Sequence, residues 1–248
     1  MSNSDIIIVN NIKYIIKNKN DIIQKTLLNG NQWNNNIVLI IGSLIKKYNL
    51  KHFVNIGSHI GTIALPISKY IEKVTAVEPF PPNYQHFLEH LKLNNITNIE
   101  SFNFAMGNKE EKGFFLDLKN ERFRNNSGGM HVVTDDDIKK NRLSASLHSK
   151  KYSNTIKKFD NLSISKFDII LIDVEGREYE MLKGGEKKIS KNRPIIIIEI
   201  WDNLKRKKEN LETSQEEVFN YIISLGYKLL NKSSNDHTFI PEDLKILI

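Results

Sequence analysis

The chain contains no cysteine among its 248 residues. This absence excludes a disulfide framework, a zinc site built on thiolates and catalysis by a cysteine nucleophile. No stretch of the chain approaches the roughly 20 consecutive apolar residues of a membrane-spanning helix. The first apolar run, Ile6–Val9, is too short for a signal peptide and lacks its charged flank. We therefore expect a soluble, cytoplasmic protein.

Arginine is scarce, whereas lysine, isoleucine and asparagine are abundant. There are 6 arginines against 30 lysines, 36 isoleucines and 30 asparagines. Codons for the last three are rich in A and T, so the composition indicates an AT-rich genome, such as that of a large DNA virus or a microbial parasite. The net charge of +7 is carried by scattered lysines, which is more typical of a solvated surface than of a nucleic-acid footprint. Nucleic acid is thus a less favoured partner than a small molecule, and no oligomeric state is predicted.

Residues 1–50 precede the regular part of the chain. Two isoleucine-rich runs around Asn10-Asn11 predict a tight β-hairpin, because asparagine tolerates a positive φ. Asp21 is the expected N-cap of a helix that ends near Asn29, and a second helix over 35–48 has apolar residues at helical spacing. We interpret this segment as an N-terminal appendage on a single domain that covers 51–248.

From His52 onward, short apolar strands alternate with helices. This alternation predicts a doubly wound α/β fold with a mostly parallel sheet, closed by a pair of strands at the C-terminal end. The expected strands cover 53–56, 74–77, 99–105, 168–174, 195–201, 227–230 and 238–240, which makes seven. The expected helices cover 60–72, 81–93, 178–189 and 214–225.

Between residues 108 and 160 the periodic pattern weakens. The sequence predicts a strand over 114–118, a loop over 125–129 and a short helix beginning at Asp135. An irregular stretch of this length inside a compact domain is usually a functional insertion or a mobile lid. We expect this insert to lie over the substrate side of the site.

Four predicted strands end in residues suited to ligand binding. In an open parallel sheet, ligands bind outside the carboxyl ends of the strands. The glycines of Gly57-Ser58-His59-Ile60-Gly61-Thr62 would let the backbone approach a ligand, but the spacing matches neither the dinucleotide motif nor the P-loop. Glu78 follows Gly57 by 21 positions, where an acid accepts hydrogen bonds from both hydroxyls of a ribose. Together these features favour a nucleoside ligand over an ordinary strand–helix turn followed by an exposed acid.

Three stretches resemble one family. Val54–Thr62 and Val77–Asn83 are similar to the first two motifs of FkbM-type S-adenosylmethionine-dependent methyltransferases, and Leu171–Glu178 resembles the most distinctive stretch of that family. The resemblance spans about 53–201. The chain departs from the usual pattern at Asn55, where the family has aspartate, and at Ser58-His59, where Ala-Asn is commoner.

The resemblance implies a Rossmann-like methyltransferase fold of class I, with S-adenosylmethionine as the cofactor. It implies that the two glycines approach the cofactor, that Glu78 binds its ribose and that 103–105 form the adenine slot. The residues expected to bind the cofactor are Asn55, Gly57, Ser58, His59, Gly61, Thr62, Glu78, Pro79, Asn103, Phe104, Ala105 and Asp173.

An alcohol acceptor needs a base to remove its proton, and acids at the strand ends are the candidates. We expect Asp173 and Glu199 to carry catalysis, with Glu175 as a further candidate unless it serves only as a helix N-terminal acid. His131, in the insert, and His59, in the glycine turn, are the alternative bases. The three carboxylates also suit Mg²⁺, but nothing in the sequence requires a metal, and we predict no metal site.

The leading hypothesis is an O-methyltransferase acting on a hydroxyl of a sugar, a glycan or a similar small polar acceptor. The first alternative is a 2′-O-methyltransferase of an RNA cap ribose, although its Lys-Asp-Lys-Glu tetrad cannot be assembled from this sequence. The second is a non-catalytic binding module with a methyltransferase-like fold, which only Asn55 supports.

Overall fold

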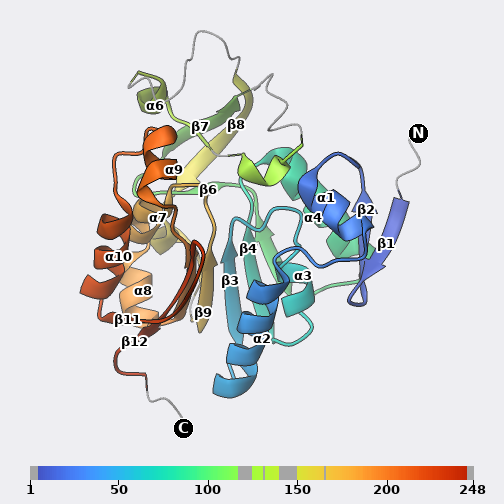
Figure 1. Ribbon diagram of the computed structural model, residues 1–248, viewed down its shortest axis with the longest axis horizontal. Helices are drawn as coiled ribbons and strands as arrows, with labels where there is room; N and C mark the ends of the chain where they lie inside the picture. Colours follow the sequence, from blue (N-terminus) through green and yellow to red (C-terminus); the bar gives the residue numbers. More distant parts are fainter. Residues whose placement is uncertain (1–4, 117–124, 131, 140–149, 165, 245–248) are drawn as a thin grey trace.

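A seven-stranded sheet lies at the centre of the computed structural model, which describes residues 5–116, 125–130, 132–139, 150–164 and 166–244 (Figure 1). The strand order is β11-β12-β10-β9-β3-β4-β5. The five strands from β10 to β5 are parallel, and β12 runs antiparallel to both β10 and β11. This arrangement confirms the expected doubly wound, mostly parallel sheet. The strands are β3 (His52–Ile56), β4 (Lys73–Val77), β5 (Ile99–Phe102), β9 (Ile169–Ile172), β10 (Ile195–Glu199), β11 (Tyr227–Ser233) and β12 (Asp236–Pro241).

Helices cover both faces of the sheet because the buried strands are apolar on both sides. On one face, α1 (Ile22–Leu28), α2 (Asn35–Tyr48), α3 (Ala64–Ile67) and α4 (Pro81–Leu93) share a core with alternate strand residues. On the other face, α7 (Glu178–Gly184), α8 (Glu186–Asn192) and α10 (Gln215–Ser224) pack on the remaining strand residues. A shorter helix, α9 (Asn203–Lys208), follows β10. Within the described ranges, every helix is too short or too polar to cross a bilayer.

The N-terminal segment forms the expected hairpin and helices. Strands β1 (Asp5–Val9) and β2 (Ile12–Ile16) pair antiparallel, and Asn10 and Asn11 turn the chain with φ of 50° and 62°. The Asp21 side chain accepts hydrogen bonds from the backbone of Ile23 and Gln24, which caps α1. Apolar residues of the segment belong to the same buried cluster as residues of β3 and β9. The segment therefore contributes to the core of the sheet.

Two predicted helices and three predicted strands are clearly shorter than expected, and of the strands β9 and β10 each end two residues early. Pro66 limits the length of α3, because a proline ring clashes with the carbonyl group of the residue four positions earlier, here Thr62. The Thr62 carbonyl oxygen instead accepts a hydrogen bond from the side chain of Gln32. The helix expected over 178–189 divides into α7 and α8 at Gly184, where a Cβ would lie 1.9 Å from the Gly107 carbonyl oxygen. The strand expected over 99–105 leaves the main sheet after Phe102.

The insert builds a second, three-stranded sheet of order β6-β8-β7. These strands are β6 (Ala105–Met106), β7 (Glu111–Leu116) and β8 (Lys150–Lys157), and the insert also contains a 3₁₀ turn, η1 (Ser127–Gly129), and the helix α6 (Asp135–Lys139). A second 3₁₀ turn, η3 (Phe159–Asn161), follows β8. Strand β7 and helix α6 correspond to the elements expected near 114 and 135, whereas β8 was not predicted.

Candidate functional site

Polar side chains from five neighbouring strands lie on one face of the sheet at its carboxyl edge. Alternate residues of a strand point to the same face. In five strands, apolar residues at alternate positions are buried beside α2 and α3, and the same alternation continues into a polar residue. These strands are β3, β4, β9, β10 and β12. In spatial order these residues are Glu78, Asn55, Asp173, Glu199 and Asp236, and all of them line one cleft. The sheet thus presents four carboxyl groups and one amide as a row.

The glycine turn after β3 is required by protein packing. Gly57 has a φ of +87°, and a Cβ there would lie 1.7 Å from the Asp173 carbonyl oxygen. Gly61 has a φ of +90°, and the Phe87 ring fills the space that its Cβ would need, at 2.4 Å. Gly57 lines the cleft, whereas Gly61 packs behind it. The turn therefore depends on glycine even before any ligand is considered.

Glu78 is held rigidly at the end of β4. Its Oε2 accepts from the backbone N–H of His59 and its Oε1 from that of Phe80, both at 2.8 Å. Burial raises the pKa of the carboxyl group to about 7, and these two backbone hydrogen bonds and Asn83 oppose the rise. A carboxylate has about four lone-pair sites, so the hydrogen bonds from His59, Phe80 and Asn83 leave capacity for one more from a ligand.

Two asparagines shape the wall beside Glu78. The Asn103 amide donates to the carbonyl oxygens of Glu78 and Pro79, at 2.8 and 3.0 Å. Asn154 of β8 donates to the same Pro79 carbonyl and accepts from the backbone N–H of Ala105. These contacts explain why the chain leaves the main sheet after Phe102. Phe104 and Ala105 line the cleft, while Asn103 supports its wall from behind.

Several buried polar atoms in the cleft have no hydrogen-bond partner among the described residues. They include both amide atoms of Asn55, the Ser58 hydroxyl, Asp173 Oδ1 and His59 Nδ1. Asn55 is 1% exposed and Ser58 is 3% exposed. Unpaired buried polar atoms cost folding free energy, so this part of the cleft is suited to a ligand that carries its own donors and acceptors.

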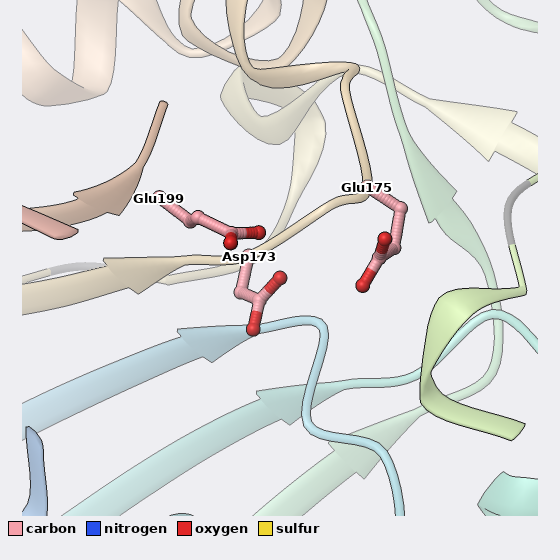
Figure 2. A group of neighbouring side chains, drawn as sticks. All are labelled: Asp173, Glu175 and Glu199. Atoms are coloured by element: carbon pink, nitrogen blue, oxygen red, sulfur yellow. The ribbon is translucent and has the colours of Figure 1, made fainter. Parts of the chain in front are cut away.

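Asp173, Glu175 and Glu199, here called the acid cluster, meet at the ends of β9 and β10 (Figure 2). One carboxylate oxygen from each lies within 4.8 Å of the others. Figure 2 shows the carboxyl groups of both glutamates turned toward Asp173. Burial raises the pKa of Asp173 well above its usual value, and the charges of Glu175 and Glu199 raise it further. Burial, together with Glu199, also raises the pKa of Asp236 to about 6.

Glu199 and the loop after β9 are braced from behind. Trp201 Nε1 donates to Glu199 Oε2 at 2.8 Å, and Trp201 is 3% exposed, so it is a supporting residue. Glu178 Oε1 accepts from the backbone N–H of Gly176, and Glu178 Oε2 pairs with the buried Arg206 at 3.3 Å. Burial raises the pKa of Glu178 to about 7, although the hydrogen bond from Gly176 and the charge of Arg206 both lower it. The distinctive Asp-Val-Glu-Gly stretch is thus held on a buried ion pair.

The insert is attached to the same loop. Arg177, which lines the cleft, donates to the carboxylate of Asp137 in α6, and the same carboxylate oxygen accepts from the backbone and hydroxyl of Thr134. Met130 and Val132 of the insert line the cleft beside residues of the main sheet. The insert therefore forms part of the cleft wall, and its role on the substrate side stays a prediction.

Most of the predicted site residues gather in this cleft, and their roles stay predictions. His131 lies outside the described residues. The cleft also contains residues that sequence reasoning missed, namely Arg177, Asp236, and Ile23, Trp33 and Asn34 of the N-terminal segment, because only folding brings them there. The predicted residues that line it are Asn55, Gly57, Ser58, His59, Thr62, Glu78, Pro79, Phe104, Ala105, Asp173, Glu175 and Glu199.

Comparison with solved structures identifies similar folds. A methyltransferase FkbM from Methylobacillus flagellatus matches 77% of this chain and 43% of its own, with 18% identity and a TM-score of 0.52. A putative caffeoyl-CoA O-methyltransferase from Staphylococcus aureus matches 88% of this chain and 89% of its own, with 14% identity and a TM-score of 0.49. The Podospora anserina methyltransferase PaMTH1, solved with S-adenosylhomocysteine, matches 83% and 77%, with 11% identity and a TM-score of 0.47. The chain therefore spans less than half the length of the first of these proteins.

Family assignment rests on the sequence. Among curated proteins, none matches the chain. The family model for the methyltransferase FkbM domain matches residues 55–229, which contain the glycine turn, Glu78 and the acid cluster. Because this match covers most of the chain and agrees with the observed sheet, the protein belongs to the FkbM methyltransferase domain family.

Proposed function

We propose that the protein transfers a methyl group from S-adenosylmethionine to a hydroxyl of a sugar, a glycan or a similar small polar acceptor. The observation that carries this proposal is the row of polar residues along one cleft. Its Glu78 end offers acceptors for a nucleoside, and its Glu199 end offers carboxylates for an acceptor hydroxyl. A donor site and a proton-accepting site thus lie side by side.

The residues present fit the methyl donor. Glu78 keeps acceptor capacity for a ribose hydroxyl beyond its hydrogen bonds with His59, Phe80 and Asn83. The unpaired atoms of Asn55, Ser58 and Asp173 suit the ammonium and carboxylate of the methionine part. Phe104 and Ala105 line the wall where an adenine would lie. When bound, the sulfonium of the donor supplies the methyl group in an in-line displacement, for which positioning provides much of the rate.

The acid cluster accepts the proton that the hydroxyl of the acceptor gives up. With donor and acceptor bound, the acceptor oxygen would take the methyl group, and sulfur would keep the electron pair of the carbon–sulfur bond. The hydroxyl proton passes to a carboxylate of the cluster. Asp173 is suited to receive it because burial raises its pKa, which makes its ionised form a stronger base. Glu199, fixed by Trp201, is placed to orient the hydroxyl.

The proposal is tested by a transfer screen. Methyl-labelled S-adenosylmethionine is incubated with the full chain and with sugars, glycans and capped RNA in parallel. Label on a sugar or glycan hydroxyl supports the proposal. Label on capped RNA alone overturns the acceptor class, and binding of the donor with no transfer to any of these acceptors favours a non-catalytic binding module.

Binding of S-adenosylhomocysteine is expected to tighten by up to about tenfold between pH 6 and pH 8. Glu78 has a pKa of about 7 in the free protein, so it is mostly protonated at pH 6. A protonated oxygen cannot accept from a ribose hydroxyl as an ionised one does. The ionised fraction therefore rises with pH, and affinity rises with it. Calorimetric titration at both pH values measures the change.

The matched variant for this prediction is Glu78→Gln, which has the same shape and does not titrate. Its affinity at pH 8 is expected to be about tenfold lower than that of the wild type. Its pH dependence should be flatter. A wild-type affinity that is the same at both pH values, or a variant that keeps the full pH dependence, would remove Glu78 from the ribose site.

Turnover is expected to survive treatment with EDTA. Proton removal by Asp173 requires no metal, although the spacing of the acid cluster is compatible with a divalent cation. The measurement is the transfer rate before and after chelation, with Mg²⁺ added back to a third sample. Loss of turnover that Mg²⁺ restores would assign the acid cluster to a cation.

A further inference from the structure

Three residues that are far apart in the sequence form a hydrogen-bonded chain beside the cleft. Asp21 lies at the start of α1, Ser127 in η1 of the insert and His59 in the glycine turn. The Ser127 hydroxyl donates to Asp21 Oδ2 at 2.9 Å, and the Ser127 backbone N–H donates to the same oxygen at 2.8 Å. The Ser127 hydroxyl also lies 2.9 Å from His59 Nε2. We call Asp21, Ser127 and His59 the relay.

The number of protons available for the hydrogen bonds of the relay determines the tautomer of His59. An ionised carboxylate only accepts hydrogen bonds, and a hydroxyl has a single proton to donate. Because that proton goes to Asp21, the Ser127 oxygen has only a lone pair left for His59. His59 Nε2 must therefore carry the proton and donate it, which leaves Nδ1 as an acceptor. Burial lowers the pKa of His59 to about 4, so the ring stays neutral at physiological pH.

His59 Nδ1 is an acceptor without a donor. It is buried and has no hydrogen-bond partner among the residues that the structure describes, and His59 as a whole is 9% exposed. The backbone N–H of the same residue donates to Glu78 Oε2. The unpaired nitrogen therefore belongs to a residue that is already bonded to the ribose-binding acid, and His59 lines the cleft.

We propose that His59 Nδ1 accepts a hydrogen bond from a ribose hydroxyl of the bound nucleoside, and that Asp21 and Ser127 are positioning residues that hold the imidazole in the tautomer this bond requires. The inference rests on the proposed function, because it assumes that the nucleoside of the methyl donor occupies the cleft. Asp21 lies outside residues 55–229, the range covered by the family model. Donor binding in this chain thus depends on a segment that precedes the family domain.

Asp21→Asn is the most direct test because it should reverse the direction of the hydrogen bonds in the relay. The amide oxygen of the substituted side chain can still accept from the backbone N–H groups of Ile23 and Gln24, which preserves the helix cap. Its amide nitrogen takes the place of Oδ2 and is a donor, so the Ser127 backbone N–H loses its acceptor there and the amide would donate to the Ser127 oxygen. The Ser127 proton would then turn to His59 Nε2, and the imidazole proton would move to Nδ1. His59 Nδ1 would then be a hydrogen-bond donor and no longer an acceptor.

The expected result of Asp21→Asn has two parts. Nitrogen-15 NMR of labelled histidine should show His59 protonated at Nε2 in the wild type and at Nδ1 in the variant. The dissociation constant of S-adenosylhomocysteine should rise about tenfold. Asp202→Asn is the matched control, since Asp202 caps α9 by accepting from the Lys205 backbone and takes no part in the relay. It should change neither measurement.

Two substitutions of His59 distinguish the contribution of Nδ1 to ligand binding from that of Nε2. Asparagine places an oxygen near the Nδ1 position and cannot reach Ser127, whereas glutamine places its amide near Nε2 and has no acceptor at Nδ1. His59→Gln should therefore weaken S-adenosylhomocysteine binding more than His59→Asn. Thermal unfolding of both variants, measured in parallel, separates loss of affinity from loss of folding at this positive-φ residue, whose φ is 50°.

The ligand comparison identifies the group that His59 contacts. Methylthioadenosine has the ribose and adenine but lacks the amino-acid part. Equal losses for both ligands in His59→Gln support the ribose contact, and a loss confined to S-adenosylhomocysteine overturns it in favour of the ammonium. If the wild type binds and all relay variants bind equally well, the relay proposal is wrong. If the wild type binds neither ligand, the proposed function itself is wrong.

Discussion

Asp173→Asn and Glu199→Gln are each expected to lower the rate of methyl transfer by about 10²-fold or more. Both residues end apolar strands that pair in parallel, with Ile196 opposite Ile170 and Ile198 opposite Ile172. Because these strands lie in the middle of the sheet, the two carboxyl groups are held on rigid elements. An amide at either position keeps the shape of the side chain but cannot take the proton of a hydroxyl.

The measurement compares turnover with binding of S-adenosylhomocysteine in the same variants. Affinity should change little in Glu199→Gln, since Glu199 acts on the acceptor. In Asp173→Asn, whose carboxyl group also faces the methionine part of the donor, the loss of turnover should exceed the loss of affinity. Glu72→Gln is a suitable control because this surface acid is paired with Lys51 far from the cleft, and it should behave as the wild type. If both acid-cluster variants turn over normally while His131→Ala does not, the insert supplies the base and the present assignment is wrong.

Gly57→Ala is expected to destabilise the fold by more than about 4 kcal/mol. Two independent causes act at this position. A residue with a Cβ is strained at a φ of +87°, and the Cβ would overlap the Asp173 carbonyl oxygen at 1.7 Å. Relief would require β3 and β9 to separate at the point where the Asp173 backbone N–H donates to the Ile56 carbonyl. The acid cluster would be displaced with it.

Two glycine controls separate these causes, and urea unfolding measures all three variants. Gly30 has a φ of +77° with nothing within 4 Å of the position that a Cβ would take, so Gly30→Ala tests strain alone and should cost roughly 1 kcal/mol. Gly42 lies in α2 with open space around it, so Gly42→Ala should stabilise by about 0.5–1 kcal/mol. A Gly57→Ala protein as stable as Gly30→Ala would contradict the close approach of the two strands.

The periodicity of the sequence was sufficient to predict the sheet and the edge at which the cleft lies. Runs such as Ile169–Ile172 and Ile195–Ile198 are buried on both faces, so their composition alone identifies them as central strands. An acid placed directly after such a run must lie at the carboxyl edge. Asp173 and Glu199 could therefore be selected from the sequence, and so could Glu78 after β4.

The partners of these residues depended on contacts between distant segments. The Asn103 amide nitrogen donates to the Glu78 and Pro79 carbonyls, whose positions depend on how the chain leaves β5. A contact of Asn103 with the cofactor stays a prediction. Asp236 enters the row because β12 pairs antiparallel with β10, which places it opposite Glu199. Neither position carries a local pattern that distinguishes it from an ordinary loop residue.

The sequence by itself determined the order of strands and helices, the edge of the sheet where the cleft lies and the acids that stand there. These features follow from local periodicity, because burial on a sheet face repeats every second residue. Only the tertiary structure brought Asp21, Ser127 and His59 into one hydrogen-bonded chain and three carboxylates within 4.8 Å of one another. Such arrangements depend on segments up to 106 residues apart, and hydrogen bonds between them leave no periodic trace in the chain.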